Sequence, residues 1–417
     1  MAAIGAQHVY KIFGEKPEIA LDLLEQGKSK AEVQQETGLV TGVQDVSFEL
    51  DSGDLFVIMG LSGSGKSTLL RCINRLVEPT RGQIYLEIDQ KRVEITSLSR
   101  KALRDVREKQ IAMIFQHFAL FPYRTVISNV TFGLEIQGVG KKERTRKGRE
   151  VLELVGLGGW ARAYPSQLSG GMQQRVGLAR ALANEAEVLL MDEPFSALDP
   201  LIKVNMQDEL LKLREKVRRT VLFVTHDLDE ALKIGDRIAI MEDGQIIQSG
   251  TPEEIIVNPR TEYVAKFVEH ADASGVLTAG TIAKVLTVNS NMSVNVDTQV
   301  TGTEPKLFAE ELDITYCLSE DGRPLGCIKD GKTFPIRTLG ENPETVDVKD
   351  VFIAAGADIP LRQIMDIRLN TSENPIIIVS KNGVFKGIIS THEILRGLLE
   401  KGRKDIQHKD NTRESGE

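Results

Sequence analysis

The sequence predicts an α/β domain with a largely parallel sheet, followed by a smaller region of tandem α+β units. Short apolar runs at residues 55–59, 111–115, 188–191, 221–225 and 238–241 are separated by helical segments, an alternation typical of parallel sheets. Further along, residues 316–329 resemble residues 377–390, with Gly326 and Gly387 lying 61 positions apart. Both copies read as a strand, a glycine turn and a strand, which indicates two copies of one small unit.

The other elements of the first domain follow from local patterns. Residues 1–14 and 43–50 alternate as strands, and residues 17–38 look helical. A helix over residues 68–76 follows a glycine-rich loop, and a closing helical region over residues 254–269 is broken at Asn258-Pro259. The tail, residues 401–417, mixes charges with glycine and serine and is expected to be disordered.

Composition restricts the class of protein. The chain has 417 residues, of which 41% are hydrophobic, and this is enough for two or three packed domains. A net charge of −8 argues against a dedicated nucleic-acid binder. Cys72, Cys317 and Cys327 lack metal-ligand spacing and fit a reducing cytosol. We see no signal peptide and no apolar run long enough to cross a membrane, so any membrane role requires a partner.

A phosphate-binding loop follows the run at residues 55–59. Residues 60–67, GLSGSGKS, fit the pattern G-x-x-x-x-G-K-[ST] between a strand and a helix. Backbone N–H groups of such a loop point at phosphates, Lys66 is expected to reach the β- and γ-phosphates, and Ser67 is expected to ligate Mg²⁺. The predicted nucleotide-binding residues here are Gly60, Leu61, Ser62, Gly63, Ser64, Gly65, Lys66, Ser67 and Thr68.

A pair of acidic residues forms the second element of this site. The apolar run at residues 188–191 ends in Asp192 and Glu193. A strand that delivers an acid is the second half of a phosphate-loop ATPase site. We expect Asp192 to hold the Mg²⁺ shell and Glu193 to orient or deprotonate the attacking water.

Residues 168–175, LSGGMQQR, resemble the signature sequence of the ABC ATPase family. The resemblance implies a phosphate-loop ABC ATPase domain with a helical subdomain, and ATP held between two subunits. The signature residues would meet the ATP of the opposing subunit: Leu168, Ser169, Gly170, Gly171, Met172 and Gln173. Ser169 and the two glycine amides suit a γ-phosphate at a helix start.

Other positions match the same family in order along the chain. Gln116 resembles the glutamine that senses Mg²⁺ and water, and His226 resembles the switch histidine at the γ-phosphate. The D-loop that crosses the dimer interface corresponds to Ser196, Ala197, Leu198 and Asp199. Phe13 resembles the aromatic residue on which adenine stacks, with a core aromatic as the alternative reading.

The insertion between Phe13 and Val43 and the phrase FALFPYRTV resemble the ATP-binding subunit of glycine betaine/proline importers, which carries C-terminal CBS domains. Pro194 departs from the alanine expected in that subfamily. The implied domains are the ATPase domain at residues 1–270, a degenerate CBS unit at 271–334 and a second unit at 335–400. Ser390 stands where nucleotide-binding CBS units carry a serine or threonine, and Glu393 stands where they often carry an aspartate. The first unit departs from this pattern, with Lys329 at the matching hydroxyl position, which argues against a bound adenine nucleotide and leaves ionic-strength sensing and a structural role as the alternatives.

The resemblance implies ATP and Mg²⁺ as cofactors, a second copy of the chain, a membrane permease and a solute-binding protein as partners, and a place at the cytoplasmic face of the membrane. Residues 117–130, with Phe118, Phe121 and Tyr123, are the candidate permease-docking region; burial within the helical subdomain is the alternative. Carnitine, choline or another amino acid are alternative solutes. A soluble ABC ATPase acting on DNA or ribosomes, or a mainly ligand-sensing CBS protein, are rival functions, but the chain has a single phosphate loop, no heptad run and an intact catalytic set.

Overall fold

The computed structural model describes residues 2–88, 90–115, 119–196, 198–216, 219–269, 271–290, 306–338, 352–369 and 374–399. Contacts divide the chain into two units, one of residues 1–255 and 259–264, the other of residues 256–258 and 265–417. Each unit has its own hydrophobic core. The domain boundaries predicted at residues 270, 334 and 400 stay predictions, and the predicted tail lies outside the described residues.

A six-stranded sheet in the order β10-β9-β3-β8-β7-β6 forms the centre of the first unit. Its strands are β3 (Leu55–Met59), β6 (Ile111–Ile114), β7 (Val188–Asp192), β8 (Thr220–Thr225), β9 (Arg237–Glu242) and β10 (Gln245–Gly250). Neighbours are parallel except for β10, which runs antiparallel to β9. Every residue of β3, β7 and β8 is buried, as expected for strands covered on both faces. The predicted parallel sheet is confirmed.

A four-stranded antiparallel sheet in the order β2-β1-β4-β5 shares a core with the first sheet. Its strands are β1 (Ala2–Phe13), β2 (Val40–Asp51), β4 (Arg81–Ile88) and β5 (Lys91–Glu94). The predicted strands at residues 1–14 and 43–50 are confirmed as β1 and β2. We did not predict β4 and β5, because they are mostly polar and only Ile84 and Leu86 are buried. Helix α3 (Lys66–Ile73) joins the two sheets by contributing Leu69 to the shared core.

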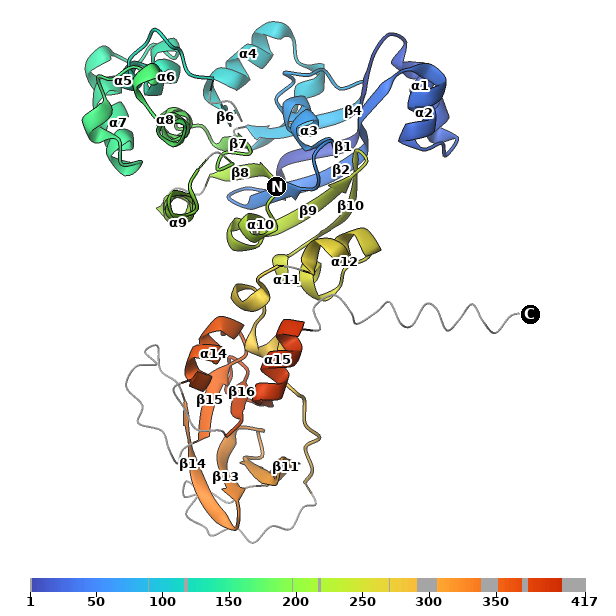
Figure 1. The fold of residues 1–417 in the computed structure, drawn as a ribbon, viewed down its shortest axis with the longest axis vertical. Coiled ribbons are helices and arrows are strands. Elements are labelled where there is room, and N and C mark those ends of the chain that lie inside the picture. Colours follow the sequence, from blue (N-terminus) through green and yellow to red (C-terminus); the bar gives the residue numbers. More distant parts are fainter. Residues whose placement is uncertain are drawn as a thin grey trace. The chain divides into compact units, whose positions relative to one another are not determined.

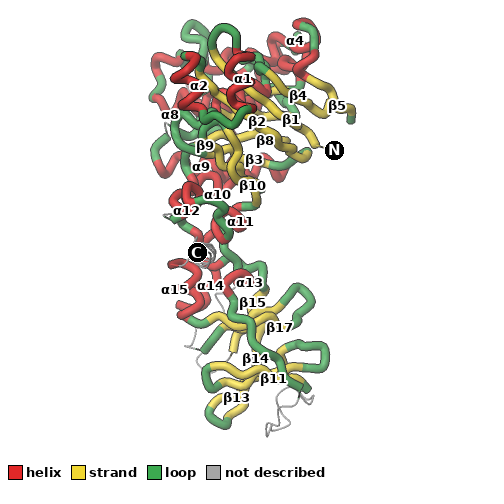
Figure 2. Tube along the Cα trace, turned by 90° about the vertical axis from the view of Figure 1, so that its right-hand side faces the viewer, coloured by secondary structure: helices red, strands yellow, loops and turns green. Residues whose placement is uncertain are grey.

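The insertion after Phe13 forms two helices, not the single helical segment that its composition predicts. They are α1 (Pro17–Glu25) and α2 (Lys30–Thr37), which lie side by side next to β1 and β2 (Figures 1 and 2). The Ser29 hydroxyl accepts a hydrogen bond from the Glu32 amide, and the Glu32 carboxylate accepts one from the Ser29 amide. This capping box starts α2 afresh. A small core around Ile12 and Leu24 anchors the pair.

The other helices that precede residue 269 fall into two sets. Those between β6 and β7 form a group of their own (Figure 1): α5 (Val126–Val130), α6 (Phe132–Ile136), α7 (Lys141–Leu154) and α8 (Gly170–Ala183), with 3-10 turns at Gly158–Trp160 and Pro165–Gln167. The others are a 3-10 turn at Ile95–Ser97, α4 (Arg100–Lys109), α9 (Pro200–Lys216), α10 (Leu228–Ile234), α11 (Pro252–Val257) and α12 (Glu262–Val268). The predicted break at Asn258-Pro259 is confirmed. Among the described helices, none is long and apolar enough to cross a membrane.

The second unit is built on a seven-stranded curled sheet in the order β11-β12-β13-β14-β15-β16-β17. The strands are β11 (Leu307–Glu311), β12 (Ile314–Leu318), β13 (Pro324–Lys329), β14 (Lys332–Thr338), β15 (Phe352–Gly356), β16 (Ile376–Val379) and β17 (Phe385–Ile389). Lys284 exchanges backbone hydrogen bonds with Ile388 of β17, and Asn289 does so with Phe308 of β11. One short segment therefore links both edges of the sheet. A 3-10 turn at Ala273–Gly275 and the helices α13 (Ala279–Ile282), α14 (Leu361–Leu369) and α15 (Thr391–Leu399) complete the unit, and α14 and α15 lie together (Figure 1).

The predicted repeat appears as two matching hairpins. Gly322 has a φ of +76° and Gly383 a φ of +78°, and each amide donates to the carbonyl of the serine three residues earlier. The copies differ outside the hairpins: the second has β15, α14 and α15 around it, whereas the described residues 306–338 of the first contain strands only. Ser390 and Glu393 hydrogen bond to each other and cap α15.

Candidate functional site

The glycine-rich loop connects the end of β3 to the start of α3. All three of its glycines have backbone conformations that other residues rarely adopt: φ is +153° at Gly60, +83° at Gly63 and +100° at Gly65. A Cβ atom on Gly60 would lie 2.2 Å from the carbonyl oxygen of Met241, and one on Gly65 would lie 2.2 Å from that of Gly42. Since both obstacles are backbone atoms, only glycine fits at either position. The loop is therefore packed tightly against β2 and β9.

Two contacts from distant parts of the chain hold this loop. The Gly244 amide, in the turn between β9 and β10, donates to the Ser64 carbonyl at 3.0 Å. The Leu61 amide donates to the hydroxyl of Tyr263, in α12, at 3.3 Å. Sequence reasoning missed Tyr263, and nothing in its local sequence signals the contact, because it depends on how α12 packs.

The Lys66 ammonium group lies within the loop that precedes it. It donates to the carbonyl oxygens of Gly60 and Leu61, each at 2.8 Å. Burial lowers the pKa of Lys66 below its usual range, against the opposing influence of the nearby Glu193 and Asp192 carboxylates. The charge is thus held inside the loop by two neutral carbonyl groups, and a phosphate would compete with them for it.

Ser67 and Asp192 form the oxygen pair that the sequence predicts for a metal ion. The Ser67 hydroxyl donates to Asp192 Oδ1 at 2.7 Å, and Asp192 is 0% exposed. The Arg71 guanidinium lies 3.4 Å from Asp192 Oδ2. No cluster of three or more His, Cys, Asp or Glu side chains suited to a metal occurs among the described residues. Hard oxygen donors of this kind fit Mg²⁺, which commonly uses one or two protein ligands together with phosphate and water oxygens.

Glu193 and His226 come from the carboxyl ends of adjacent parallel strands. Glu193 follows β7, and its amide donates to the Val224 carbonyl of β8 at 3.0 Å. His226 follows β8, and its Nδ1 lies 3.2 Å from Glu193 Oε1. The side chains are 15% and 57% exposed respectively. An acid and an imidazole therefore meet at the edge of the sheet where ligands of open α/β sheets usually bind.

The LSGGM segment forms the start of α8. The Ser169 hydroxyl accepts a hydrogen bond from the Met172 amide at 3.3 Å and so caps the helix. Leu168 is buried, whereas Ser169 and Gly170 are exposed, and a Cβ atom on Gly170 would meet nothing within 4 Å. Gln173 turns back to the carbonyl oxygens of Pro165 and Leu168. The helix start is thus preformed and open to an anion.

The other predicted residues are placed only in part. Gln116 and Ala197 lie outside the described residues. Of the D-loop, the Ser196 hydroxyl donates to the Glu193 carbonyl at 3.0 Å, and the Asp199 carbonyl accepts from the Lys203 amide. Phe13 ends β1 with 40% of its surface exposed.

Two neighbours lie close to the Phe13 ring. The Lys11 ammonium lies 5.0 Å from the centre of the Phe13 ring. A Cβ atom on Gly42 would lie 2.9 Å from the same ring. The ring is therefore partly packed and partly exposed, as a stacking platform for a base needs.

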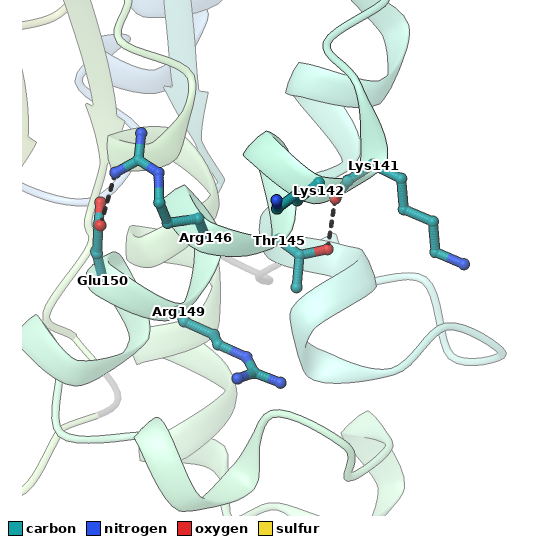
Figure 3. Close-up of a pocket in the computed structure, with 6 residues that line it drawn as sticks. All are labelled: Lys141, Lys142, Thr145, Arg146, Arg149 and Glu150. Atoms are coloured by element: carbon teal, nitrogen blue, oxygen red, sulfur yellow. Dashed lines mark hydrogen bonds and ion pairs between the residues drawn. The ribbon is translucent and has the colours of Figure 1, made fainter.

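A hollow on the surface of α7 lies apart from these residues. It is lined by Lys141, Lys142, Thr145, Arg146, Arg149 and Glu150, none of them a predicted site residue (Figure 3). Within it, Arg146 pairs with Glu150 at 2.7 Å, and Thr145 donates to the Lys141 carbonyl. It is a basic surface without catalytic groups.

Comparison with known proteins shows the family to which the chain belongs. Residues 43–196 match the model of the ABC transporter family. The chain is 47% identical to the glycine betaine/carnitine transport ATP-binding protein of Listeria monocytogenes over 95% of this chain and 98% of that protein. It is 43% identical to the glycine betaine/proline betaine transport system ATP-binding protein of Escherichia coli over 95% and 97%. The glycine betaine transport ATP-binding protein of Bacillus subtilis is 59% identical, over 67% of this chain and 66% of that protein.

Solved structures share the fold. A dimer of the ATP-binding cassette MJ0796 in a post-hydrolysis state with ADP and Pi is 32% identical, with a TM-score of 0.51. It covers 60% of this chain and 98% of its own. A second dimeric structure of MJ0796, described as a bacterial ABC transporter cassette, matches equally well.

Proposed function

Because the chain belongs to the family of ABC transporter ATP-binding proteins, we propose that it is the ATP-hydrolysing subunit of an importer for an osmoprotectant such as glycine betaine or proline. One observation carries the catalytic part of the proposal. Ser67 contacts Asp192, and His226 contacts Glu193. Lys66 lies close enough to both carboxylates for their negative charges to oppose the lowering of its pKa by burial. This is one continuous set of groups for binding and cleaving a triphosphate.

Each residue of the set has a role in the proposed reaction. Lys66 and the amides of residues 60–68 bind the phosphates, and Phe13 stacks on the adenine. Glu193 orients the attacking water and accepts its proton, while His226 contacts the γ-phosphate. Gln116 would complete the polar shell around the water. Ser67, Asp192 and Gln116 would hold Mg²⁺, which supplies neutralisation of phosphate charge.

A second copy of the chain would complete the site. The MJ0796 structures are dimers. In this chain the exposed start of α8 offers Ser169, Gly170 and Gly171 to an anion, which we propose is the γ-phosphate of ATP bound to the partner copy. Residues 196–199 would cross the same interface. Each copy alone has an incomplete site and is expected to hydrolyse ATP slowly.

A permease would couple ATP hydrolysis to transport of the solute. Tyr123 is 93% exposed, and Phe121 packs on Phe132 with ring centres 4.5 Å apart while 38% of it stays exposed. His117 and Phe118 lie outside the described residues. We propose that the region of Phe121 and Tyr123 docks a permease helix at the cytoplasmic face of the membrane, and that a solute-binding protein delivers the solute.

Osmoprotectant transport is supported by the relatives' activities. They are named for glycine betaine, carnitine and proline betaine, and others, from Ruegeria pomeroyi and Pelagibacter ubique, for trimethylamine N-oxide. All of these solutes carry a methylated ammonium or amine oxide group. Carnitine, choline or another amino acid are the alternative solutes for this chain.

Uptake by the reconstituted transporter tests the proposal. The chain and its co-purifying membrane partner are placed in vesicles with ATP, and uptake of labelled glycine betaine, proline, carnitine and choline is measured at several salt concentrations. We expect ATP-dependent uptake of at least one methylated solute, and none with Glu193→Gln. Uptake that does not depend on ATP, or that survives Glu193→Gln, contradicts the proposed function.

A further inference from the structure

A partly buried ion cluster lies beside His226 and is not part of the site described above. The Lys203 ammonium, in the first turn of α9, lies 2.5 Å from Asp227 Oδ2 and 2.8 Å from Glu230 Oε1. Glu230 is 4% exposed, and the Lys203 side chain is 22% exposed. A carboxylate that is this deeply buried requires a partner charge, so the link to Lys203 is a built contact and not an accidental surface pair.

One end of this cluster fixes both neighbours of His226. Glu230 accepts a hydrogen bond from the hydroxyl of Thr225, the residue before His226, at 2.5 Å. Asp227, the residue after it, caps α10 by accepting the Glu230 amide at 3.2 Å, and its own amide donates to the Thr225 hydroxyl. The backbone on either side of His226 is therefore tied to the carboxylates that Lys203 bridges.

The other end of the cluster reaches the D-loop. Residues 196–199 precede α9 directly, and the Lys203 amide donates to the Asp199 carbonyl at 2.9 Å. Lys203 is thus one helical turn from the segment that we assign to the dimer interface. A displacement of that segment would carry Lys203 with it and, through Asp227 and Glu230, the backbone that bears His226.

We propose that Lys203 is a positioning residue that couples the D-loop to His226, so that contact with the partner copy sets the imidazole against Glu193 for hydrolysis. The proposal rests on the function proposed above. Lys203 touches neither phosphate nor water in this scheme. It acts only through Asp227 and Glu230, and it should influence the rate of hydrolysis far more than the binding of nucleotide.

The same two helices provide a matched control. Lys233 of α10 pairs with Asp208 of α9 at 2.7 Å, and their side chains are 35% and 45% exposed. This pair joins α9 to α10 as Lys203 does, but it lies on the surface and does not involve the neighbours of His226. Exposed pairs contribute little to stability. Removing the Lys233–Asp208 pair tests whether the loss of any ion pair between these two helices is enough to slow hydrolysis.

The experiment compares the full chain with three variants, Lys203→Met, Lys203→Arg and Lys233→Met. Nucleotide affinity is measured with a fluorescent ATP analogue, and kcat and KM are measured for ATP. We expect Lys203→Met to lower kcat by about 10- to 100-fold, the effect of a displacement of about 1 Å. Its affinity for the analogue should stay within roughly twofold of the parent. Lys203→Arg should recover most of the rate, and Lys233→Met should leave it unchanged.

Two results would overturn the proposal. One is a Lys203→Met chain that hydrolyses ATP as fast as the Lys233→Met chain. The other concerns the carboxylates that Lys203→Met leaves unpaired, which destabilise the fold by themselves. The double variant Lys203→Met with Glu230→Gln removes one of these charges. If the double variant recovers both thermal stability and hydrolysis, the lower rate of Lys203→Met came from the unpaired charge, and the proposal is wrong. If it recovers thermal stability but still hydrolyses ATP slowly, the contact between Lys203 and the carboxylates positions His226. Failure of the proposed function would look different, because the parent chain would then not hydrolyse ATP.

Discussion

Removing the hydroxyl of Ser67 should destabilise the protein even without nucleotide or metal. In Ser67→Ala, Asp192 loses a donor at 2.7 Å while staying completely buried. A hydrogen bond to a charged group contributes about 1.5–3 kcal/mol. Arg71 compensates little, because its distance of 3.4 Å exceeds the usual 2.7–2.9 Å or so of a charge-assisted hydrogen bond.

This free energy converts into a measurable shift in Tm. For a domain of this size, each kcal/mol lowers Tm by about 2–4 °C, so Ser67→Ala should melt roughly 3–12 °C below the parent. The assay is differential scanning calorimetry of the full chain in a chelating buffer without nucleotide. Ser67→Thr keeps the hydroxyl, and Ser62→Ala alters an exposed serine of the same loop. Both should melt close to the parent.

The reasoning fails if Ser67→Ala melts with the parent, or if Ser62→Ala is lowered as far. Either result would mean that the hydroxyl does not hold Asp192 in the resting protein. The contact would then form only when a metal ion binds.

Three other predictions concern the loop, the base and the ion cluster. Gly65→Ala should abolish nucleotide binding in calorimetry, because its Cβ atom would meet the Gly42 carbonyl oxygen at 2.2 Å. Gly63→Ala should lose less, because it carries only the strain of a φ of +83° and its Cβ atom meets nothing within 4 Å. Phe13→Ala should weaken ATP binding by roughly 5- to 150-fold, the equivalent of about 1–3 kcal/mol of base stacking, and Phe13→Tyr should not. Burial opposes ionisation of Asp227, but the hydrogen bond from Lys203 brings its pKa below the ordinary 3.8. The ionised form therefore stabilises the fold above this pH, and the destabilisation by Lys203→Met in urea titrations should shrink as the pH falls below it.

Local sequence patterns were sufficient to predict the parallel sheet and the phosphate loop. Strands β3, β7 and β8 are unbroken apolar runs, since both of their faces are covered. Gly60 and Gly65 have positive φ angles, which require glycine, so the glycine pattern of the sequence reports this backbone conformation directly. These features carry their own signal, because their physical cause lies within a few residues.

Contacts between distant segments were beyond reach of the same reasoning. Strand β4 buries only Ile84 and Leu86, so its pattern is too weak to recognise without β1 beside it. Tyr263 reaches Leu61 across about two hundred residues, and Lys203 reaches Glu230 only because two helices pack together. Nothing near either residue in the sequence signals its partner.

The repeat in the second unit shows the same division. The hairpin turns at Gly322 and Gly383 were predictable, because a serine and a glycine three residues apart specify them. The helices that accompany only one copy were not. Whether this unit senses a ligand depends on surfaces that no turn motif encodes, and Ser390 and Glu393 already serve to cap α15.

The size of the Glu193→Gln chain in solution tests most directly whether two copies share each nucleotide. With ATP and Mg²⁺ present, sedimentation should show a dimer that disappears when nucleotide is omitted or when Ser169 is replaced by a bulky phenylalanine. A chain that stays monomeric with ATP at every concentration, or a dimer indifferent to both changes, would contradict a site built from two polypeptides.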